Sequence, residues 1–394
     1  MKVWIINPFD NLPLEGYRPM RFWLMAYAFC RNGDDVTLWT GDFSHFAKKK
    51  RVFLAPTDSP PFRLRILPVV PYKSNVSLKR LYSHWKLART WKREAEKTPC
   101  DDLPDVIISS SPPLTLTHEA GKFAKRHGAK FAVDIMDAWP ETFERVIPRC
   151  FLAPLRCVAR KNYRSADLIT AVAHHYEAIA QNYGCSCPVK LFYHGIDMSN
   201  AQIVSSESKT PNHNNIRLVY AGNLGISYDL RTVLHALAKL PESITVTIAG
   251  TGGDEDNLRK NAAALGISNR VVFAGYLDSA ELQKTLATAD IGIIPMNSDS
   301  HVGIPYKMAD YSKYSLAIAS SLSGESAALI NEYKAGAIYD SGSPDSLVAA
   351  IRQITGNLKE YKENSGRMCR EKFDASKIYA TYVDAIHKIL SHHT

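Results

Sequence analysis

The sequence predicts an α/β fold of two doubly wound domains, each a parallel sheet with helices on both faces. Short apolar strands alternate with helical patterns along the chain, and this alternation runs twice. A polar stretch at residues 205–215, rich in Ser and Asn, separates the two runs and has the composition of a linker. A length of 394 residues also fits two domains. We therefore expect domains at residues 1–200 and 216–375, joined by a linker at 201–215.

Strands are expected at short apolar runs, and helices where apolar residues recur every three or four positions. The strands expected in the first domain are residues 3–6, 36–40, 63–67, 106–108, 131–134, 168–171 and 189–192, with helices such as 20–31 and 114–126 between them. Those expected in the second domain are 217–221, 245–249, 271–274, 291–294, 317–319 and 337–339, with helices such as 229–239, 256–265 and 280–287. Ligands bind outside the carboxyl ends of parallel strands, so with two domains we expect the site in the cleft between them.

The positive charge of the chain lies in its first half. The formal charge is +9, and residues 1–194 hold 29 Lys and Arg against 18 Asp and Glu, whereas residues 195–394 hold 19 against 21. This asymmetry predicts that one domain faces an anionic partner, either a membrane surface or nucleic acid. Because the sequence shows no zinc-finger, aromatic RNA-binding or helix-turn-helix pattern, we expect no nucleic acid.

Basic residues are densest at residues 72–97, where a helix is expected from Leu78 onward. The apolar residues of this helix follow helical spacing and have Lys and Arg between them; they are Leu78, Leu81, Tyr82, Trp85 and Ala88. A basic helix with interfacial aromatic residues is typical of a segment lying on an anionic membrane. The alternative is a solvated helix whose apolar stripe packs on its own domain. The residues expected to contact the acceptor or the membrane are Lys79, Arg80, Trp85, Lys86, Arg89 and Trp91.

The chain has the pattern of a cytosolic protein. No apolar run approaches the roughly 18 residues needed to span a bilayer, and the start shows no signal-peptide pattern. The seven cysteines show no Cys-x-x-Cys spacing, which indicates reduced thiols rather than disulfides or a metal site. We expect a cytoplasmic protein held peripherally on the inner face of the cell membrane.

Two loops of the first domain carry candidate site residues. Gly16 and Arg18 precede a helix after the first strand, where a close backbone approach and a helix N-terminus favour an anion; the alternative is a structural turn. Asp137 and Glu141 follow the strand at 131–134, and carboxylates there suit hydroxyl recognition or proton transfer. The alternative for them is a polar loop around a buried Trp139.

Three loops of the second domain carry the other candidates. Gly303 and Pro305 lead into a helix with Lys307 in its first turn, where a lysine suits a pyrophosphate. Asp310 lies on the same helix face and suits ribose hydroxyls, as in dinucleotide sites; the alternative is a surface ion pair with Lys307. Two glycine-rich loops suit a phosphate and contain Gly222, Asn223, Gly225, Gly250 and Gly252.

In this order the motifs resemble the GT4 family of retaining glycosyltransferases, and specifically the subgroup that builds bacterial capsule, O-antigen and exopolysaccharide. The resemblance covers essentially the whole chain. It rests on GYR at residues 16–18, NGDDV at 32–36, FSH at 43–45, DAWPE at 137–141, HGID at 194–197, AGNLG at 221–225 and GIPYK at 303–307.

The resemblance implies a GT-B fold, two Rossmann-like domains facing a central cleft. The second domain would bind a UDP- or GDP-sugar, with Lys307 on the diphosphate, Asp310 in place of a ribose-binding glutamate, and Gly16 against the phosphates from the other domain. The first domain would bind a lipid-linked glycan acceptor, and a final helix at 376–394 would cross back onto it. We expect Asp137 and Lys307 to be catalytic, with no metal or other cofactor, because positioning and stabilisation of the departing diphosphate carry the reaction.

The chain departs from the family pattern at several positions. Asn223 and Asp229 lie where a paired Arg and Lys are usual, Val302 replaces the first glutamate of the E-x7-E pattern, and Met136 and Asp137 lie where a histidine is usual. These departures leave open that the chain is a noncatalytic, membrane-associated GT-B paralogue. A UDP-sugar 2-epimerase, which shares the GT-B fold, is the other alternative.

Overall fold

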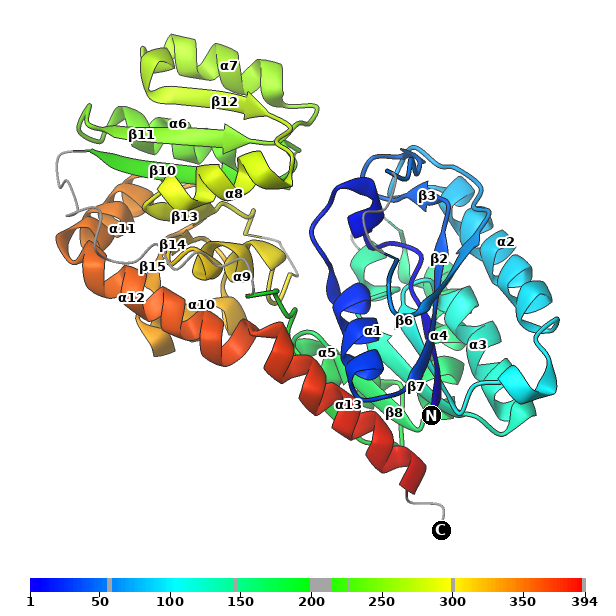
Figure 1. Ribbon diagram of the computed structural model, residues 1–394. Helices are drawn as coiled ribbons and strands as arrows, with labels where there is room; N and C mark the ends of the chain where they lie inside the picture. Colours follow the sequence, from blue (N-terminus) through cyan, green and yellow to red (C-terminus); the bar gives the residue numbers. More distant parts are fainter. Residues whose placement is uncertain (55–58, 145–146, 199–214, 226, 299–301, 392–394) are drawn as a thin grey trace. The chain divides into compact units, whose positions relative to one another are not determined.

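The computed structural model describes residues 1–54, 59–144, 147–198, 215–225, 227–298 and 302–391. The chain forms two compact units, which are Met1–Gly195 with Ala375–Thr394 (unit 1) and Ile196–Asp374 (unit 2) (Figure 1). Each unit is a parallel sheet with helices on both faces, which confirms the predicted fold class. Apart from residue 215, the linker predicted at 201–215 lies outside the described residues.

The sheet of unit 1 has seven strands in the order β5-β2-β1-β6-β7-β8-β9, and all its pairs are parallel. The seven were all predicted, to within three residues at each end. Their bounds are β1 (Lys2–Ile6), β2 (Asp35–Gly41), β5 (Arg63–Leu67), β6 (Val106–Ser111), β7 (Lys130–Ile135), β8 (Leu168–Ala171) and β9 (Val189–Leu191). A small antiparallel pair that was not predicted follows β2, formed by β3 (Phe43–Ser44) and β4 (Lys49–Lys50).

Both faces of this sheet are buried. Trp4 and Ile6 of β1 face one core, and Val3 and Ile5 face the other, because side chains alternate along a strand. The first face is covered mainly by α2 (Leu78–Ala95), α3 (Leu114–His127), α4 (Ala153–Ser165) and α5 (His174–Asn182). The second is covered by α1 (Arg21–Arg31) and α13 (Ala375–Ser391).

A buried ion pair lies beneath α13. Arg21 Nε donates to Asp134 Oδ2 at 2.8 Å, and both side chains are fully buried. The same guanidinium donates through Nη1 to the backbone carbonyl of Phe192 at 2.9 Å. Tyr379 and Tyr382 of α13 lie over it, with ring centroids 5.9 and 5.8 Å from Arg21 Cζ. Helix α13 therefore seals a charged pair inside unit 1.

The sheet of unit 2 has six parallel strands in the order β12-β11-β10-β13-β14-β15. All six were predicted, to within two residues at each end. Their bounds are β10 (Ile216–Ala221), β11 (Ile244–Ala249), β12 (Val271–Gly275), β13 (Ile291–Ile294), β14 (Ala317–Ser320) and β15 (Gly336–Ile338). The helices are α6 (Leu230–Ala238), α7 (Glu255–Ala264), α8 (Ser279–Thr288), α9 (Tyr306–Lys313), α10 (Gly324–Tyr333), α11 (Pro344–Gly356) and α12 (Leu358–Met368).

Short helical turns connect several of these elements. The 3-10 turns are η1 (Pro13–Glu15), η2 (Cys100–Asp102), η3 (Glu141–Phe143), η4 (Arg149–Leu152) and η5 (Ser268–Arg270), and a π-helical turn, η6 (Cys369–Phe373), follows α12. In each sheet the strand order reverses beside the first strand, between β1 and β6 and between β10 and β13. Ligands of doubly wound sheets bind at such a point, outside the carboxyl ends of the strands.

Candidate functional site

In unit 2 the loops after β10 and β11 are in backbone contact. The Gly222 N–H donates to the carbonyl of Ala249 at 2.9 Å. A Cβ at Gly250 would lie 1.8 Å from the Gly222 carbonyl oxygen, and one at Gly252 would lie 2.3 Å from that of Leu224. Gly222 and Gly250 also have φ of +154° and +134°, which only glycine adopts readily. These glycines are thus required for loop packing, and their contact with a phosphate remains a prediction.

Lys307 lies in the first turn of α9, as predicted, and its ammonium group is held by aromatic rings. Its Nζ is 4.1 Å from the ring centroid of Tyr228 and 5.0 Å from that of Tyr220. A Cβ at Gly222 would approach Nζ to 2.6 Å, so the missing side chain makes room for the lysine. The structure therefore brings together Lys307 and Gly222, two predicted site residues, at the point where the strand order reverses.

The ammonium group of Lys307 has no salt-bridge partner among the described residues. It makes no salt bridge with any described residue, Asp310 included, so the predicted alternative of a surface ion pair is wrong. Burial lowers the pKa of Lys307 to about 8, although the nearby Asp310 acts in the opposite direction. Cation–π contacts stabilise the ammonium group only in part. The site is therefore suited to an anion that supplies the missing negative charge.

Tyr311 fixes α9 against the sheet. It is fully buried, and its hydroxyl accepts the Ala221 N–H at 3.0 Å and donates to the Ile293 carbonyl at 3.3 Å. It therefore joins the ends of β10 and β13 to the helix that carries Lys307. We did not predict roles for Tyr220, Tyr228 or Tyr311. Only the spacing of Tyr311, four residues after Lys307, gave a signal, because such residues share a helix face.

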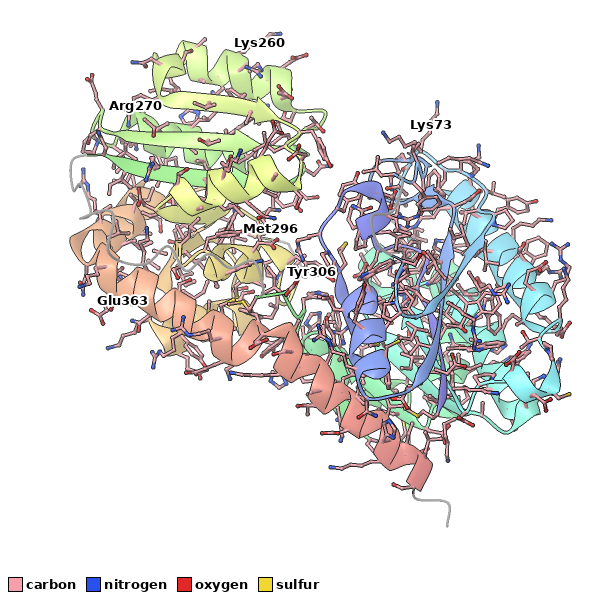
Figure 2. All side chains as sticks on the ribbon, viewed as in Figure 1. Lys73, Lys260, Arg270, Met296, Tyr306 and Glu363 are labelled. Atoms are coloured by element: carbon pink, nitrogen blue, oxygen red, sulfur yellow. The ribbon has the colours of Figure 1, made fainter. Side chains whose placement is uncertain are left out.

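The other predicted residues of unit 2 lie around the same loops. The Gly303 carbonyl accepts the hydroxyl of Ser326 at the start of α10, and Pro305 directly precedes α9. Met296 follows β13 and Tyr306 begins α9 (Figure 2). Asn223 is exposed and Gly225 half-buried in the loop after β10.

Asp229, which lies where the family has a basic residue, caps a helix. Its Oδ1 accepts the Thr232 N–H at 3.1 Å at the start of α6, and its Oδ2 accepts the Gly342 N–H at 3.0 Å. This carboxylate satisfies backbone donors at the helix N-terminus. Capping α6 is therefore a sufficient structural reason for an aspartate at position 229.

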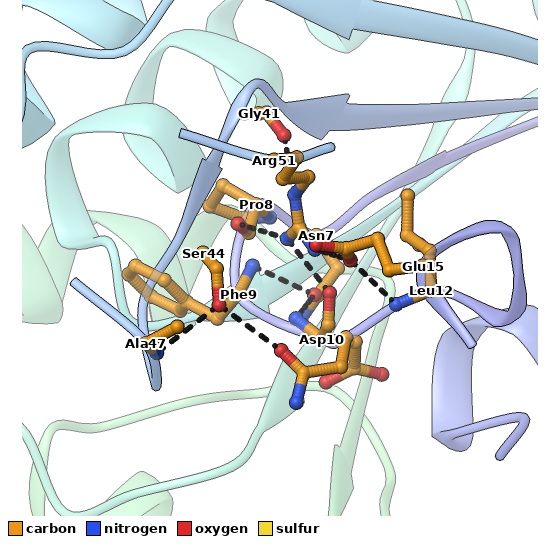
Figure 3. Close-up of polar contacts among 11 residues, drawn as sticks. Asn7, Pro8, Phe9, Asp10, Leu12, Glu15, Gly41, Ser44, Ala47 and Arg51 are labelled. Atoms are coloured by element: carbon orange, nitrogen blue, oxygen red, sulfur yellow. Dashed lines mark hydrogen bonds and ion pairs between the residues drawn. The ribbon is translucent and has the colours of Figure 1, made fainter. Parts of the chain in front are cut away.

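In unit 1 the loop after β1 is locked by a buried arginine that sequence reasoning missed (Figure 3). Arg51 pairs with Glu15 and donates to the carbonyls of Gly41 at 2.7 Å and Asp10 at 2.8 Å. Gly16 ends the turn η1 with φ of +83°, so it occupies the predicted structural turn. Arg18 is half-buried nearby. Contact of either residue with a phosphate remains a prediction.

Asp137 follows β7, as predicted, but is engaged locally. Its Oδ1 accepts the Ala138 N–H at 2.8 Å and the Thr142 hydroxyl at 3.1 Å. Burial raises the pKa of its carboxyl. Trp139 is 2% exposed, so the polar loop around a buried tryptophan is present, and the catalytic role of Asp137 remains a prediction. Glu141 accepts the hydroxyl of Tyr183.

The residues predicted to contact a membrane divide between two faces of α2. Lys79, Lys86 and Arg89 are exposed and Trp85 is 41% exposed. Arg80 and Trp91, however, are 8% and 0% exposed, so the prediction of membrane contact is wrong for them, whereas their contact with the acceptor remains a prediction. Both lie on the face that packs on the sheet. The alternative, that the apolar stripe packs on its own domain, is confirmed for Leu81 and Ala88, which pack in the core of unit 1. It is wrong for Leu78, Tyr82 and Trp85, whose exposed fractions are 84%, 52% and 41%.

Part of the chain matches a known protein family. Residues 202–367 match the family described as "Glycosyl transferases group 1". The sulfoquinovosyl transferase SQD2 of Arabidopsis thaliana is 24% identical over 280 residues, 68% of this chain and 53% of the relative. The lipopolysaccharide core biosynthesis glycosyltransferase LpsE of Rhizobium meliloti is 29% identical over 126 residues, 32% of this chain and 35% of the relative. The chain therefore spans about half, or less, of the curated relatives it matches.

Solved structures show a similar fold over nearly the whole chain. Anabaena Alr3699/HepE has a TM-score of 0.72 at 15% identity, covering 98% of this chain and 100% of its own. The sucrose-phosphate synthase of Thermosynechococcus elongatus has a TM-score of 0.73 at 12% identity, with both chains fully covered. At such identities the likeness shows the fold alone, which is that of the GT-B glycosyltransferases with two Rossmann-like halves.

Proposed function

We propose that this chain is a retaining glycosyltransferase that moves a sugar from a UDP- or GDP-linked donor to a lipid-linked glycan in surface polysaccharide biosynthesis. The observation that carries the proposal is Lys307, a half-buried cation at the strand reversal of unit 2 that makes no salt bridge with any residue the structure describes. It lies inside the region that matches the group 1 glycosyl transferases. That match and the named relatives support a transferase.

The donor is proposed to bind unit 2. Lys307 would neutralise its diphosphate, and Asp310 would accept hydrogen bonds from the ribose. Structures of HepE in complex with UDP, and with UDP and glucose, support a nucleotide-sugar donor for this fold. The rings of Tyr220 and Tyr228 hold the Lys307 ammonium group in place before the donor binds. The site therefore reorganises little when the diphosphate departs. This chemistry requires no metal, and we expect transfer to persist in EDTA.

A thermal-shift scan with UDP, GDP, CMP, dTDP and ADP tests the donor site. We expect one uridine or guanosine diphosphate to stabilise the protein by about 2.7 kcal/mol at 100 times its Kd. The corresponding labelled nucleotide sugar should then donate its sugar to a lipid-linked acceptor. Release of an epimerised nucleotide sugar without transfer would indicate an epimerase. Binding by no nucleotide would contradict the proposal and favour a noncatalytic protein.

The membrane proposal rests on the outer face of α2. Leu78, Tyr82 and Trp85 are exposed there beside Lys79, Lys86 and Arg89, and the Arg89 guanidinium lies 4.2 Å from the Trp85 ring centroid. Among the described residues no helix is both long and apolar enough to cross a membrane. We propose that this face, the α2 outer face, holds the protein peripherally on the inner side of the cell membrane.

Neutralising the α2 outer face is expected to weaken membrane binding. Each basic residue near an anionic surface contributes about 1 kcal/mol, so Lys79→Gln, Lys86→Gln and Arg89→Gln together should lower the affinity for anionic liposomes by on the order of 100-fold. Co-sedimentation measures the change. The matched control replaces Lys122, Lys125 and Arg126, exposed on α3, with glutamine. An equal loss in both triple variants would show that net charge, not this face, binds the membrane.

A further inference from the structure

Arg80 is a buried cation with no salt-bridge partner in the part of the chain that the structure describes. It is 8% exposed, and its Nη1 donates to the Asn75 carbonyl at 2.8 Å. Its Nε has no hydrogen-bond partner, and no described carboxylate makes a salt bridge with it. Burial lowers the pKa of the guanidinium, although Tyr72 and Asp137 act in the opposite direction. A buried charge without a salt bridge lowers the free energy of unfolding. We therefore look for a function of Arg80 other than stabilising the fold.

A second cation shares a ring with Arg80. Lys48 lies after β3 with φ of +55° and is half-buried. Its Nζ is 5.1 Å from the Tyr72 ring centroid, and Arg80 Cζ is 5.8 Å from the same centroid. Burial and the charge of Arg80 lower the pKa of Lys48 to about 8. Two positive charges thus share one tyrosine ring and repel each other, and an anion near both would relieve that repulsion.

Two histidines lie close to these two cations. His84 is 4% exposed, and its Nε2 is buried without a hydrogen-bond partner. His45 Nδ1 lies 2.6 Å from the Tyr72 hydroxyl. Burial and the neighbouring positive charge lower the pKa of His45 to about 3 and that of His84 well below its usual value, so both rings are neutral. A neutral imidazole still offers an N–H to an anion without adding to the repulsion.

Aromatic rings from separate loops surround Arg80. Its Cζ lies 4.5 Å from the Trp139 centroid and 5.8 Å from that of Phe9. Phe9 follows β1, Tyr72 follows β5 and Trp139 follows β7. All three loops leave the carboxyl edge of the unit 1 sheet, where ligands of such sheets bind. Basic and aromatic residues together suit a ligand that has both an anionic group and a ring.

We infer that Arg80, Lys48 and His84 form an anion subsite in unit 1 that binds the phosphate of a sugar phosphate belonging to the acceptor. This inference rests on the proposed function, which assigns the acceptor to unit 1, and it adds the chemical class of the group recognised there. Neither Arg80 nor Lys48 makes a salt bridge with a described carboxylate, and the phosphate would supply that negative charge and accept the N–H of His84. The rings of Phe9 and Trp139 lie beside it for the attached sugar.

Binding of glucose 1-phosphate, inorganic phosphate and glucose tests the subsite by calorimetry. We expect both phosphates to bind the wild type and the control variant Lys125→Gln, which changes an exposed lysine of α3. Arg80→Gln and Lys48→Gln should each weaken glucose 1-phosphate binding at least about tenfold, through loss of a charge-assisted hydrogen bond. Glucose alone should not bind. Equal affinity in Arg80→Gln and the wild type would overturn the inference.

Two further arms separate this subsite from other sources of phosphate binding. UDP binding should be unchanged in Arg80→Gln, and glucose 1-phosphate binding unchanged in Lys307→Ala, so failure of one site is distinguishable from failure of the other. Phosphate binding that is lost in Lys307→Ala but kept in Arg80→Gln contradicts the inference. So does an Arg80→Gln defect seen only with phosphatidylglycerol vesicles and not with glucose 1-phosphate, since the ligand would then be a lipid headgroup.

The stability of Arg80→Met distinguishes a binding role from a structural one. If Arg80 is held for a ligand, removing an uncompensated buried charge should leave the melting temperature unchanged or raise it in the absence of phosphate. The same variant should lose the stabilisation that glucose 1-phosphate gives the wild type. A melting temperature several degrees lower, with ligand stabilisation retained, would show that Arg80 serves the fold.

Discussion

Replacing Lys307 with alanine is expected to remove both nucleotide-induced stabilisation and sugar transfer. The ammonium group has no salt bridge in the described part of the chain, so a bound diphosphate would be its main ionic partner. Loss of one such charge-assisted contact weakens binding by about 10- to 100-fold. Loss of a group that stabilises a departing anion lowers kcat by about 100- to 1,000-fold. Thermal shift and initial-rate measurements with the preferred donor check both effects.

The control for Lys307→Ala is Lys284→Ala, an exposed lysine of α8 in the same unit. This variant should bind and transfer like the wild type. Because Lys307 is a poorly solvated cation, its removal should not lower the melting temperature of the free protein. Unfolding of Lys307→Ala at markedly lower temperature, with donor binding intact, would mean that the lysine serves the fold and not the donor.

The pH dependence of donor binding is an independent test of the ionic role of Lys307. With a pKa of about 8 in the free protein, Lys307 loses its charge as the pH rises above that value. The affinity for the diphosphate should therefore be constant below pH 7 and fall up to tenfold per pH unit above pH 8. Lys307→Arg keeps its charge throughout and should abolish this dependence. A wild-type affinity that is flat to pH 10 would contradict an ionic role for Lys307.

Asp134→Ala is expected to lower the free energy of unfolding of unit 1 by about 3–5 kcal/mol, because it leaves Arg21 buried without its partner. The pair is fully buried, joined at 2.8 Å and covered by Tyr379 and Tyr382. Urea unfolding followed by tryptophan fluorescence measures the loss. The double variant Arg21→Met with Asp134→Leu should recover most of it, since replacing a buried pair with apolar side chains is often neutral.

An exposed pair serves as the control for Asp134→Ala. Arg63 lies 2.8 Å from Asp35, and their side chains are 48% and 45% exposed. Asp35→Ala should cost at most about 1 kcal/mol, because solvent screens such pairs. If Asp35→Ala and Asp134→Ala lowered the free energy of unfolding equally, burial would not determine how much the Arg21–Asp134 pair stabilises unit 1.

The strands of the two parallel sheets could be predicted because most of them are short apolar runs bounded by polar residues. The orientation of α2 could not. Both of its faces carry aromatic residues, and hydropathy assigns Arg80 and His84 to solvent although both are buried. Only residues distant in sequence, Phe9 and Trp139 among them, explain that burial. Periodicity therefore identified the helix but not the side of it that faces the sheet.

The site of unit 2 was predicted in part for a similar reason. Lys307 stands out in sequence because a glycine-containing loop precedes it. The rings that hold its charge, Tyr220 and Tyr228, lie some 80 residues earlier and carry no local signal. Gly250 and Gly252 were interpreted as phosphate-binding glycines, yet each is also needed where one backbone passes close to another. A glycine pattern alone does not distinguish these two requirements.

Helix α13 also sets the order in which the two units can be completed during translation. Residues 1–195 leave the ribosome first, but the face of β1 that carries Val3 and Ile5 is covered in part by residues 375–391. At roughly 5–20 residues per second, unit 2 takes on the order of ten seconds or more to synthesise. During that time the nascent first unit exposes an apolar surface to chaperones and to neighbouring chains. Unit 2 is a single continuous segment of the chain and can complete its fold without residues 375–391. Unit 1 is therefore synthesised first but completes its fold last.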